Sequence, residues 1–360
     1  MIDTKKRYGK TEEEIMAVVG SAVSRSTTST DTMLTSERSK IQRYYDGELP
    51  KRQHEGSSSY VSSDVYDGVE SMKAQLLEVF AGGHDIIRFK PLNDQDVPAA
   101  RLETEYVSDQ IFAVDKNNGF DRFSDVIDDS LKNRNGVVQV YWEECIERDS
   151  HTFDDMSLED VQALAAQEDV EIEADLETPD GDDDDAEPRY SGTWTRVIDN
   201  SGLRIENVPP EEYYSQGKKK RREDGARGRK TLKTKAELLK DGYDKKKVEA
   251  VGSDSELDFS SERQTREKDT DDGLPDGETQ PELAPVMLHE TFIPLALKSD
   301  GTSALYRIVH AGGQLFEIDE VEEDNFVVFT PLRRPHSQHG NNFAKRIVPT
   351  QNARTVLMRG

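Results

Sequence analysis

Apolar residues recur every three or four positions through much of the first 135 residues, and this period predicts amphipathic helices. The helices expected from it cover residues 11–22, 33–45, 62–81, 97–115 and 120–133. Thr11 and Glu14 have the spacing of a capping box, and Pro98 fits the first turn of the fourth helix. The last two helices should pack antiparallel, because only a short Asn-Gly turn separates them.

A second pattern, rich in β-branched and aromatic residues, predicts strands. The clearest is 136–144, and we expect residues 193–198 to be its hairpin partner. Four β-rich runs between 286 and 341, separated by Gly-containing turns, predict an antiparallel meander. The other expected elements are strands at 86–89 and 203–208, a helix capped by Thr234 and Glu237, and a helix over 342–358 that Pro349 interrupts early.

These elements predict an α+β fold, with N-terminal helices followed by antiparallel sheet. The regions expected are a helical region running into a strand (1–145), an acidic mobile insertion (146–190), a mixed α/β segment with a basic loop (191–251), a polar mobile linker (252–285), the β meander (286–341) and the start of a further helix (342–360). The sequence stops within that last element, so we expect a fragment of a longer protein.

Charge is distributed very unevenly along the chain. The formal net charge is -26, from 47 Lys plus Arg against 73 Asp plus Glu, and charged residues make up 33% of the sequence. Residues 151–187 hold ten Asp, six Glu and no Lys or Arg. Apart from one helical island capped by Ser157, disorder is expected there. So acidic a chain should have little general affinity for DNA, which depends on Lys and Arg neutralising phosphates.

The single cysteine, Cys145, excludes an internal disulfide framework and any CxxC metal site. No apolar run approaches the roughly 20 residues that span a bilayer. Lys5, Lys6 and Arg7 are not followed by the apolar region of a signal peptide. We therefore expect no membrane association, and a chain made and kept in a cytoplasm.

Enzyme motifs are absent, so neither catalysis nor a cofactor is expected. The sequence lacks GxxxxGKS/T, GxGxxG and HExxH, which hold nucleotides or catalytic zinc. His336 and His339 are close enough in sequence to share a metal with a carboxylate. A structural turn is the favoured interpretation. The acidic run at 182–185 lacks the fixed geometry of a cation site, and the loosely EF-hand-like stretch at 269–280 ends in Gln instead of Glu.

One basic run is suited to phosphate contact. It consists of Lys218, Lys219, Lys220, Arg221 and Arg222. We take these five residues as candidates for contact with DNA or a partner, with a solvated loop as the favoured alternative. Only Tyr213 and Tyr214 lie nearby as aromatics, so base stacking is not indicated.

Dispersed motifs along most of the chain follow the order found in portal proteins of short-tailed bacteriophages (podoviruses). They include Arg43-Tyr44-Tyr45-Asp46-Gly47, Tyr60-Val61-Ser62-Ser63-Asp64-Val65, Asn135-Gly136-Val137-Val138-Gln139, Val208-Pro209-Pro210-Glu211-Glu212, Asp241-Gly242-Tyr243-Asp244 and the stretches 331–340 and 351–359. The chain resembles this family, and the resemblance implies a portal wing and hip region followed by the beginning of the stem helix at 342–360. The rest of the portal fold does not follow.

The resemblance also implies a function. Such subunits form a homo-oligomeric ring, of twelve copies, at one vertex of the capsid in the virion. Double-stranded DNA passes through the ring during packaging and ejection, and the ring contacts the major capsid protein, the terminase and tail adaptor proteins. Assembly takes place in the host cytoplasm. Two alternatives stay open: another virion structural or adaptor protein, and a metal-dependent nucleic-acid enzyme built on His336 and His339.

Overall fold

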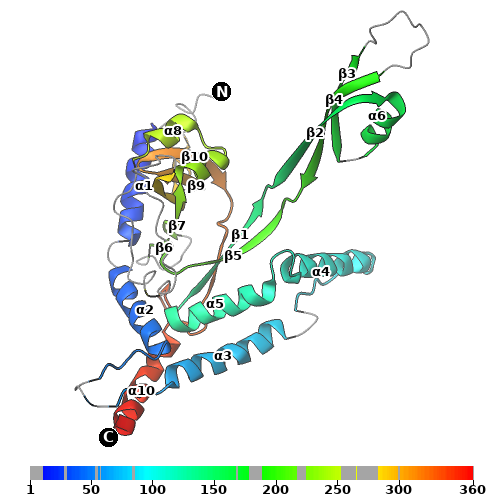
Figure 1. The fold of residues 1–360 in the computed structure, drawn as a ribbon. Helices are drawn as coiled ribbons and strands as arrows, with labels where there is room; N and C mark the ends of the chain where they lie inside the picture. Colours follow the sequence, from blue (N-terminus) through cyan, green and yellow to red (C-terminus); the bar gives the residue numbers. More distant parts are fainter. Residues whose placement is uncertain are drawn as a thin grey trace, which may run out of the picture. The chain divides into compact units, whose positions relative to one another are not determined.

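The computed structural model describes residues 11–27, 31–52, 56, 58–82, 86–167, 169–177, 189–216, 224–252, 265, 283–298 and 301–359. The chain forms two compact units (Figure 1): Met1–Val140 together with Ile205–Gly360, and Tyr141–Arg204. Helices and antiparallel strands are mixed, so the fold class is α+β as predicted. In the described part of the chain, no helix combines the length and apolar character needed to cross a membrane.

Helices make up most of the N-terminal part of the first unit. They are α1 (Glu12–Thr27), α2 (Asp31–Tyr45), α3 (Asp64–Ala81), α4 (Val97–Phe112, preceded by the 3-10 turn η2, Asp94–Asp96) and α5 (Gly119–Asn133). The later part of this unit contains the helices α7 (Lys235–Lys240), α8 (Lys245–Ala250) and α10 (Phe343–Arg359). The capping boxes predicted at Thr11 and Thr234 are present, each exchanging two hydrogen bonds with the Glu three residues later. Local capping chemistry therefore determines where these helices begin.

A five-stranded antiparallel sheet forms the centre of the first unit, in the order β10-β9-β8-β7-β6. Its strands are β6 (Tyr213–Ser215), β7 (Arg227–Thr234), β8 (Pro285–Leu295), β9 (Ala304–Ala311) and β10 (Gln314–Val321). Three of them, β8 to β10, form a meander as predicted, but the fourth run expected in it is β11 (Phe326–Phe329), which belongs to another sheet.

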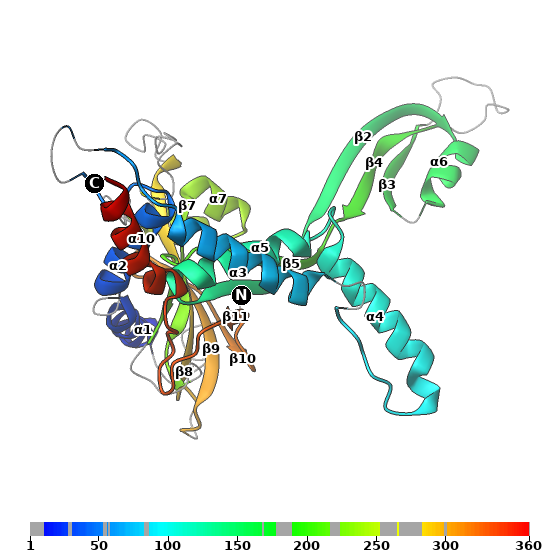
Figure 2. The ribbon, with the colours of Figure 1, turned by 90° about the horizontal axis from the view of Figure 1, so that it is seen from below.

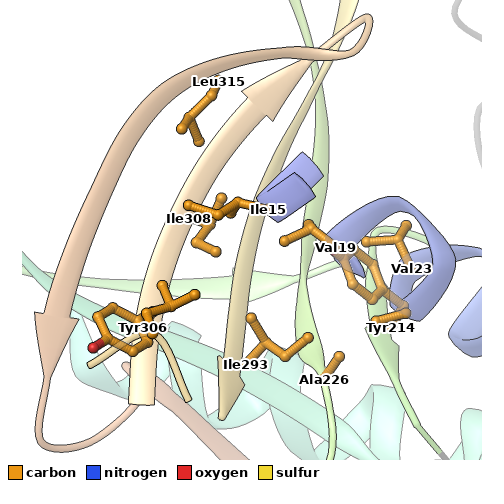
Figure 3. Packing of buried hydrophobic residues seen from close by; sticks show 11 residues of the cluster. Ile15, Val19, Val23, Tyr214, Ala226, Ile293, Tyr306, Ile308 and Leu315 are labelled. Carbon is orange, nitrogen blue, oxygen red and sulfur yellow. The ribbon is translucent and has the colours of Figure 1, made fainter. Parts of the chain in front are cut away.

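The two faces of this sheet have different covers. On one face, Ile15, Val19 and Val23 of α1 pack against Ile293 and Ile308 of the sheet (Figure 3). On the other face, Leu238 of α7 and Val248 of α8 pack with Leu288, Val309 and other apolar residues. Because strand side chains alternate between faces, β8 and β9 contribute to both cores.

A separate apolar cluster joins α2, α3, α5 and α10. Val126, Ile127 and Leu131 of α5 face Val65 and Val69 of α3, and the two helices lie side by side (Figures 1 and 2). The expected antiparallel pairing of α4 with α5 was wrong: in both views α4 projects away from α5. The turn between them is held by Asn117, which bonds to the backbone of Gln110 and Ile205, and the contact between the helices there includes the stacked rings of Phe112 and Phe123.

A three-stranded sheet has the order β11-β1-β5, from β1 (Gly136–Glu143), β5 (Gly202–Val208) and β11 (Phe326–Phe329). The predicted hairpin between 136–144 and 193–198 was therefore wrong. Strand β1 pairs with β11, Gly136 opposite Phe329, and has β5 on its other side. Gly136 also lies so close to α5 that an added Cβ would be 2.1 Å from the Val126 carbonyl oxygen.

The second unit, Tyr141–Arg204, holds more regular structure than its composition suggested. Strands β2 (Ile146–Ser157), β4 (Arg189–Asp199) and β3 (Val170–Glu177) form a sheet in the order β2-β4-β3. The helical island is confirmed as α6 (Leu158–Ala165), capped by Ser157. Most of the expected disorder in residues 151–177 is replaced by strands; the mobility assigned to this insertion stays a prediction, and residues 178–188 lie outside the described ones.

Three smaller expectations also differ from the structure. Residues 86–89 form no strand, and α1 extends to Thr27, beyond its predicted end at residue 22. Helix α10 runs without interruption through Pro349, which is exposed. A proline there leaves only the Lys345 carbonyl without its helical partner, and Lys345 and Pro349 both lie on the exposed side of the helix. Most of the predicted linker 252–285 lies outside the described residues.

Candidate functional site: the seat of the C-terminal helix

Helix α10 buries one face against α2, α3 and α5. Ala344, Gln351 and Thr355 on that face are fully buried, while Arg346, Thr350 and Ala353 are exposed. The approach to α3 is close, because a Cβ added to Gly68 would lie 2.5 Å from Cδ1 of Ile347. The buried face is unusual in containing polar side chains, and these define the site.

Gln351 bonds to three backbone groups, one in the last turn of α2, one in the segment that follows it and one in the first turn of α3. Its amide Nε2 donates to the carbonyl oxygens of Tyr44 and Leu49, both at 3.1 Å. Its Oε1 accepts from the backbone N–H of Val65 at 2.9 Å. That N–H belongs to the first turn of α3 and has no helical acceptor. The amide therefore satisfies polar groups that would otherwise be buried without partners.

Two further side chains repeat this arrangement at four-residue spacing. Thr355 Oγ1 accepts from the backbone N–H of Ser62 at 3.1 Å. Arg359 donates to the carbonyl oxygens of Tyr60, Lys51 and Pro50 at 2.7, 3.1 and 2.9 Å. We call Gln351, Thr355 and Arg359 the α10 seat. Because residues four apart share a helix face, the seat fixes both the rotation and the direction of α10.

Ion pairs reinforce the seat at both ends. Arg354 pairs with Asp64, and hydrogen bonds from Ser62 and Arg354 lower the pKa of Asp64. Near the start of α10, Glu37 accepts from Arg134 and Lys345. Burial alone would raise the pKa of Glu37, but these two cations lower it.

The loop between β11 and α10, residues 331–341, is built tightly. The side chain of Asn135 accepts from Thr330 Oγ1 and from the Gly340 N–H, and donates to the Gln338 carbonyl at 3.0 Å. The N–H of Asn341 donates to the Leu332 carbonyl at 2.8 Å, which closes the loop. Side chains 333–337 are exposed. This loop thus presents them on a rigid support.

The two histidines that are candidate metal ligands, His336 and His339, lie on this loop. His336 is exposed, with a positive φ of 61°, whereas His339 is largely buried. Burial, with the nearby Arg38 and Arg134, lowers the pKa of His339 to about 4. Among the described residues, no group of three His, Cys, Asp or Glu side chains is placed to hold a metal ion.

The predicted contact residues Lys218, Lys219, Lys220, Arg221 and Arg222 lie outside the described residues. The structure describes only the strands that flank them. The N–H of Gln216 donates to the Ala226 carbonyl at 2.9 Å, and Gln338 donates to the Gln216 carbonyl at 3.3 Å. Their role as DNA or partner contacts stays a prediction.

A polar network connects the two sheets of the first unit. Arg229 of β7 binds both oxygens of Glu206 and also Glu212 and Gln139. The chain of bonds continues from Gln139 to Glu290, which accepts from Arg307 at 2.6 Å.

Pairing outweighs the loss of solvation at Arg229 but not at Glu212. Although burial lowers it, the pKa of Arg229 is raised overall by Glu206 and Glu212. Burial raises the pKa of Glu212, against the opposing effect of Arg229. Breaking one member would leave buried charge unpaired.

Sequence reasoning did not find the α10 seat, because a polar residue on a helix is normally assigned to solvent. The one available signal was spacing: residues 351, 355 and 359 are polar at four-residue intervals. That signal is weak without knowledge of which face is buried.

Comparison with protein families decides the identity. The chain matches the family model described as phage SU10 portal protein over residues 15–360. It belongs to that family. The match covers both units and ends in α10, so this chain is a portal protein of the podovirus type and a structural protein of the virion. No protein with a curated description is similar enough to match it.

Membership of the portal family identifies which parts of a portal subunit the α10 seat connects. The N-terminal helices and antiparallel sheets correspond to the portal wing and hip, and α10 is the stem helix at the C-terminal end. The α10 seat is therefore the junction between the portal body and its stem. Portal families are structural and not enzymatic.

Proposed function

We propose that the chain is one subunit of a ring of twelve copies at a unique capsid vertex, forming the channel for double-stranded DNA during packaging and ejection. In this proposal the ring contacts the major capsid protein in the virion, the terminase during packaging in the host cytoplasm, and tail adaptor proteins afterwards. The observation that carries it is the family match over residues 15–360.

The α10 seat supports this proposal. A stem helix that lines or surrounds a channel must be held at one angle in every subunit, since small differences would accumulate around a ring. Three side chains that bond to seven backbone groups hold α10 in that way. Excess negative charge elsewhere on the chain would keep DNA from binding tightly as it passes.

Particle mass tests the proposal most directly. The purified full-length protein should assemble into closed rings, and native mass spectrometry should give twelve copies, with images showing a central channel. Particles that are monomers or hexamers in every condition would instead favour an adaptor or another virion protein. Stoichiometric metal and DNA cleavage, both lost in His339→Ala, would favour an enzyme.

A further inference from the structure

The last 36 residues of the chain, 325–360, have a charge opposite to that of the rest. They contain six Lys or Arg and no Asp or Glu, in a chain whose formal net charge is -26. Three of the six have partners: Lys345 pairs with Glu37, Arg354 with Asp64, and Arg359 bonds to backbone carbonyls. The other three therefore need a separate explanation.

Those three are Arg333, Arg334 and Arg346, and all are exposed. Within the described residues, no carboxylate pairs with any of them. Arg333 and Arg334 lie in the 331–341 loop, whose backbone is fixed by Asn135 and by the bond from Asn341 to Leu332. The backbone that carries these two exposed side chains is therefore held in one conformation.

Arg346 lies in the first turn of α10, where a cation is disfavoured. That turn has no acidic residue, and Lys345 precedes Arg346. A helix N-terminus already carries partial positive charge, so additional cations there oppose folding. The arrangement is costly for stability, which favours a role in binding.

The backbone positions of the three arginines lie near one another. The N–H of Asn341 bonds to the Leu332 carbonyl, so Arg333 starts next to the point from which α10 leaves. Chain dimensions then limit the backbone separation of Arg333 and Arg346 to roughly 20 Å. His339, in the same loop, has its pKa lowered in part by Arg38 and Arg134, which agrees with a positive local potential.

We propose that Arg333, Arg334 and Arg346 form a contact surface for the phosphate backbone of double-stranded DNA. The inference rests on the proposed function, because it names the surface at which the channel meets its DNA. Guanidinium groups match phosphate oxygens in geometry and charge. Duplex DNA presents one negative charge per roughly 1.7 Å of axis, so a surface of this size faces several phosphates.

The acidity of the whole chain does not prevent this contact. Charges separated by more than about 10 Å are largely screened at 0.1 M salt. Of the excess negative charge, a large part is in Tyr141–Arg204, with 21 acidic and four basic residues. Glu37, the carboxylate paired with Lys345, is itself mostly buried and bonded twice. A local basic surface can therefore act on its own.

The test measures binding of a short fluorescent DNA duplex to the assembled protein at several salt concentrations. The test variant combines Arg333→Gln, Arg334→Gln and Arg346→Gln. The control combines Arg101→Gln, Lys245→Gln and Lys246→Gln, which removes the same charge from other exposed positions. The test variant should bind roughly tenfold more weakly at low salt, and each lost phosphate contact should reduce the salt slope by about 0.9. The control should resemble the unmodified protein.

Three results would overturn the proposal. In the first, the unmodified rings bind no DNA at low salt. In the second, the test variant and the control lose affinity equally, so that only net charge matters. In the third, the test variant keeps its DNA affinity but no longer assembles, which would indicate that these arginines bind acidic residues of a second copy of the chain. Particle mass in the same samples separates these results from failure of the proposed function, which would appear as a lack of rings in the unmodified protein.

Discussion

Gln351→Glu tests whether the seat of α10 depends on a neutral amide. The substitution keeps the shape of the side chain but replaces the Nε2 donor with a carboxylate oxygen facing the Tyr44 and Leu49 carbonyls. Two hydrogen bonds are lost, each contributing about 1 kcal/mol. A negative charge is also buried at a site with no solvent exposure and no cation bonded to it, which costs several kcal/mol. We expect the free energy of unfolding to fall by about 3–5 kcal/mol at pH 7.

The effect should depend on pH in a defined direction. Burial raises the pKa of the introduced carboxyl group above its unfolded value of about 4.3. The deficit relative to the unmodified protein is therefore smallest below that value, where the protonated acid can donate one hydrogen bond again. It grows as the pH rises through the folded-state pKa.

Urea unfolding of both proteins between acidic and neutral pH measures this difference, and hydrogen exchange of α10 peptides locates it. Gln162→Glu on α6 is the matched control, because it makes the same change on an exposed helical position. A loss at Gln351 that is no larger than at Gln162, or that does not change with pH, would refute the role assigned to the seat.

Three further predictions concern charge and burial elsewhere. Arg227→Met should lower the free energy of unfolding by about 3–5 kcal/mol, because it removes the cation that pairs with the buried Asp324; adding Asp324→Leu should restore much of it in urea unfolding. His289 and His310 stack at 5.0 Å, and burial lowers their pKa to about 4 and about 3. Because the unfolded chain takes up these protons near pH 6.5 and the folded chain does not, stability should fall as the pH drops from about 6.5 towards 4; His289→Gln should reduce that slope in pH-dependent unfolding. Arg346→Glu should raise the free energy of unfolding by about 0.3–1 kcal/mol by placing an acid at a helix N-terminus, while weakening DNA binding; no gain in thermal unfolding temperature would contradict the electrostatic argument.

Local signals predicted the positions of most helices. Thr11, Ser157 and Thr234 cap their helices through bonds to residues three positions later, so the information lies within one turn of sequence. Strand pairing could not be predicted in this way. Gly136 pairs with Phe329, nearly two hundred residues later in the sequence, and such a pairing depends on which side chains are buried in the folded core.

The second unit shows how composition can obscure a pattern. Val170 and Ile172 alternate with Glu171 and Glu173, which is the two-residue period of a strand with one apolar side. The density of acidic residues nevertheless predicted disorder. In β3 the acids occupy alternate positions, so strand formation does not require burying them.

The candidate surfaces differ in how far sequence could reveal them. Gln351 and Thr355 are recognisable only once the buried face of α10 is known. The sequence alone shows that the region containing Arg333, Arg334 and Arg346 is basic, since no acidic residue follows Asp324. The prediction did not include them because it was based on consecutive basic residues, such as those at 218–222, and these three are dispersed along a loop and a helix.

The second unit is inserted in the sequence between two neighbouring strands, β1 and β5. Strands β1 and β5 are neighbours, Glu143 of one pairs with Arg204 of the other, and the Cys145 N–H bonds to Ser201 Oγ. The 58 residues 144–201 therefore form an insertion whose two ends are paired with each other. A short turn joining Glu143 to Gly202 should satisfy the same two strands, so deletion of residues 144–201 should leave the part of the chain that holds α10 able to fold.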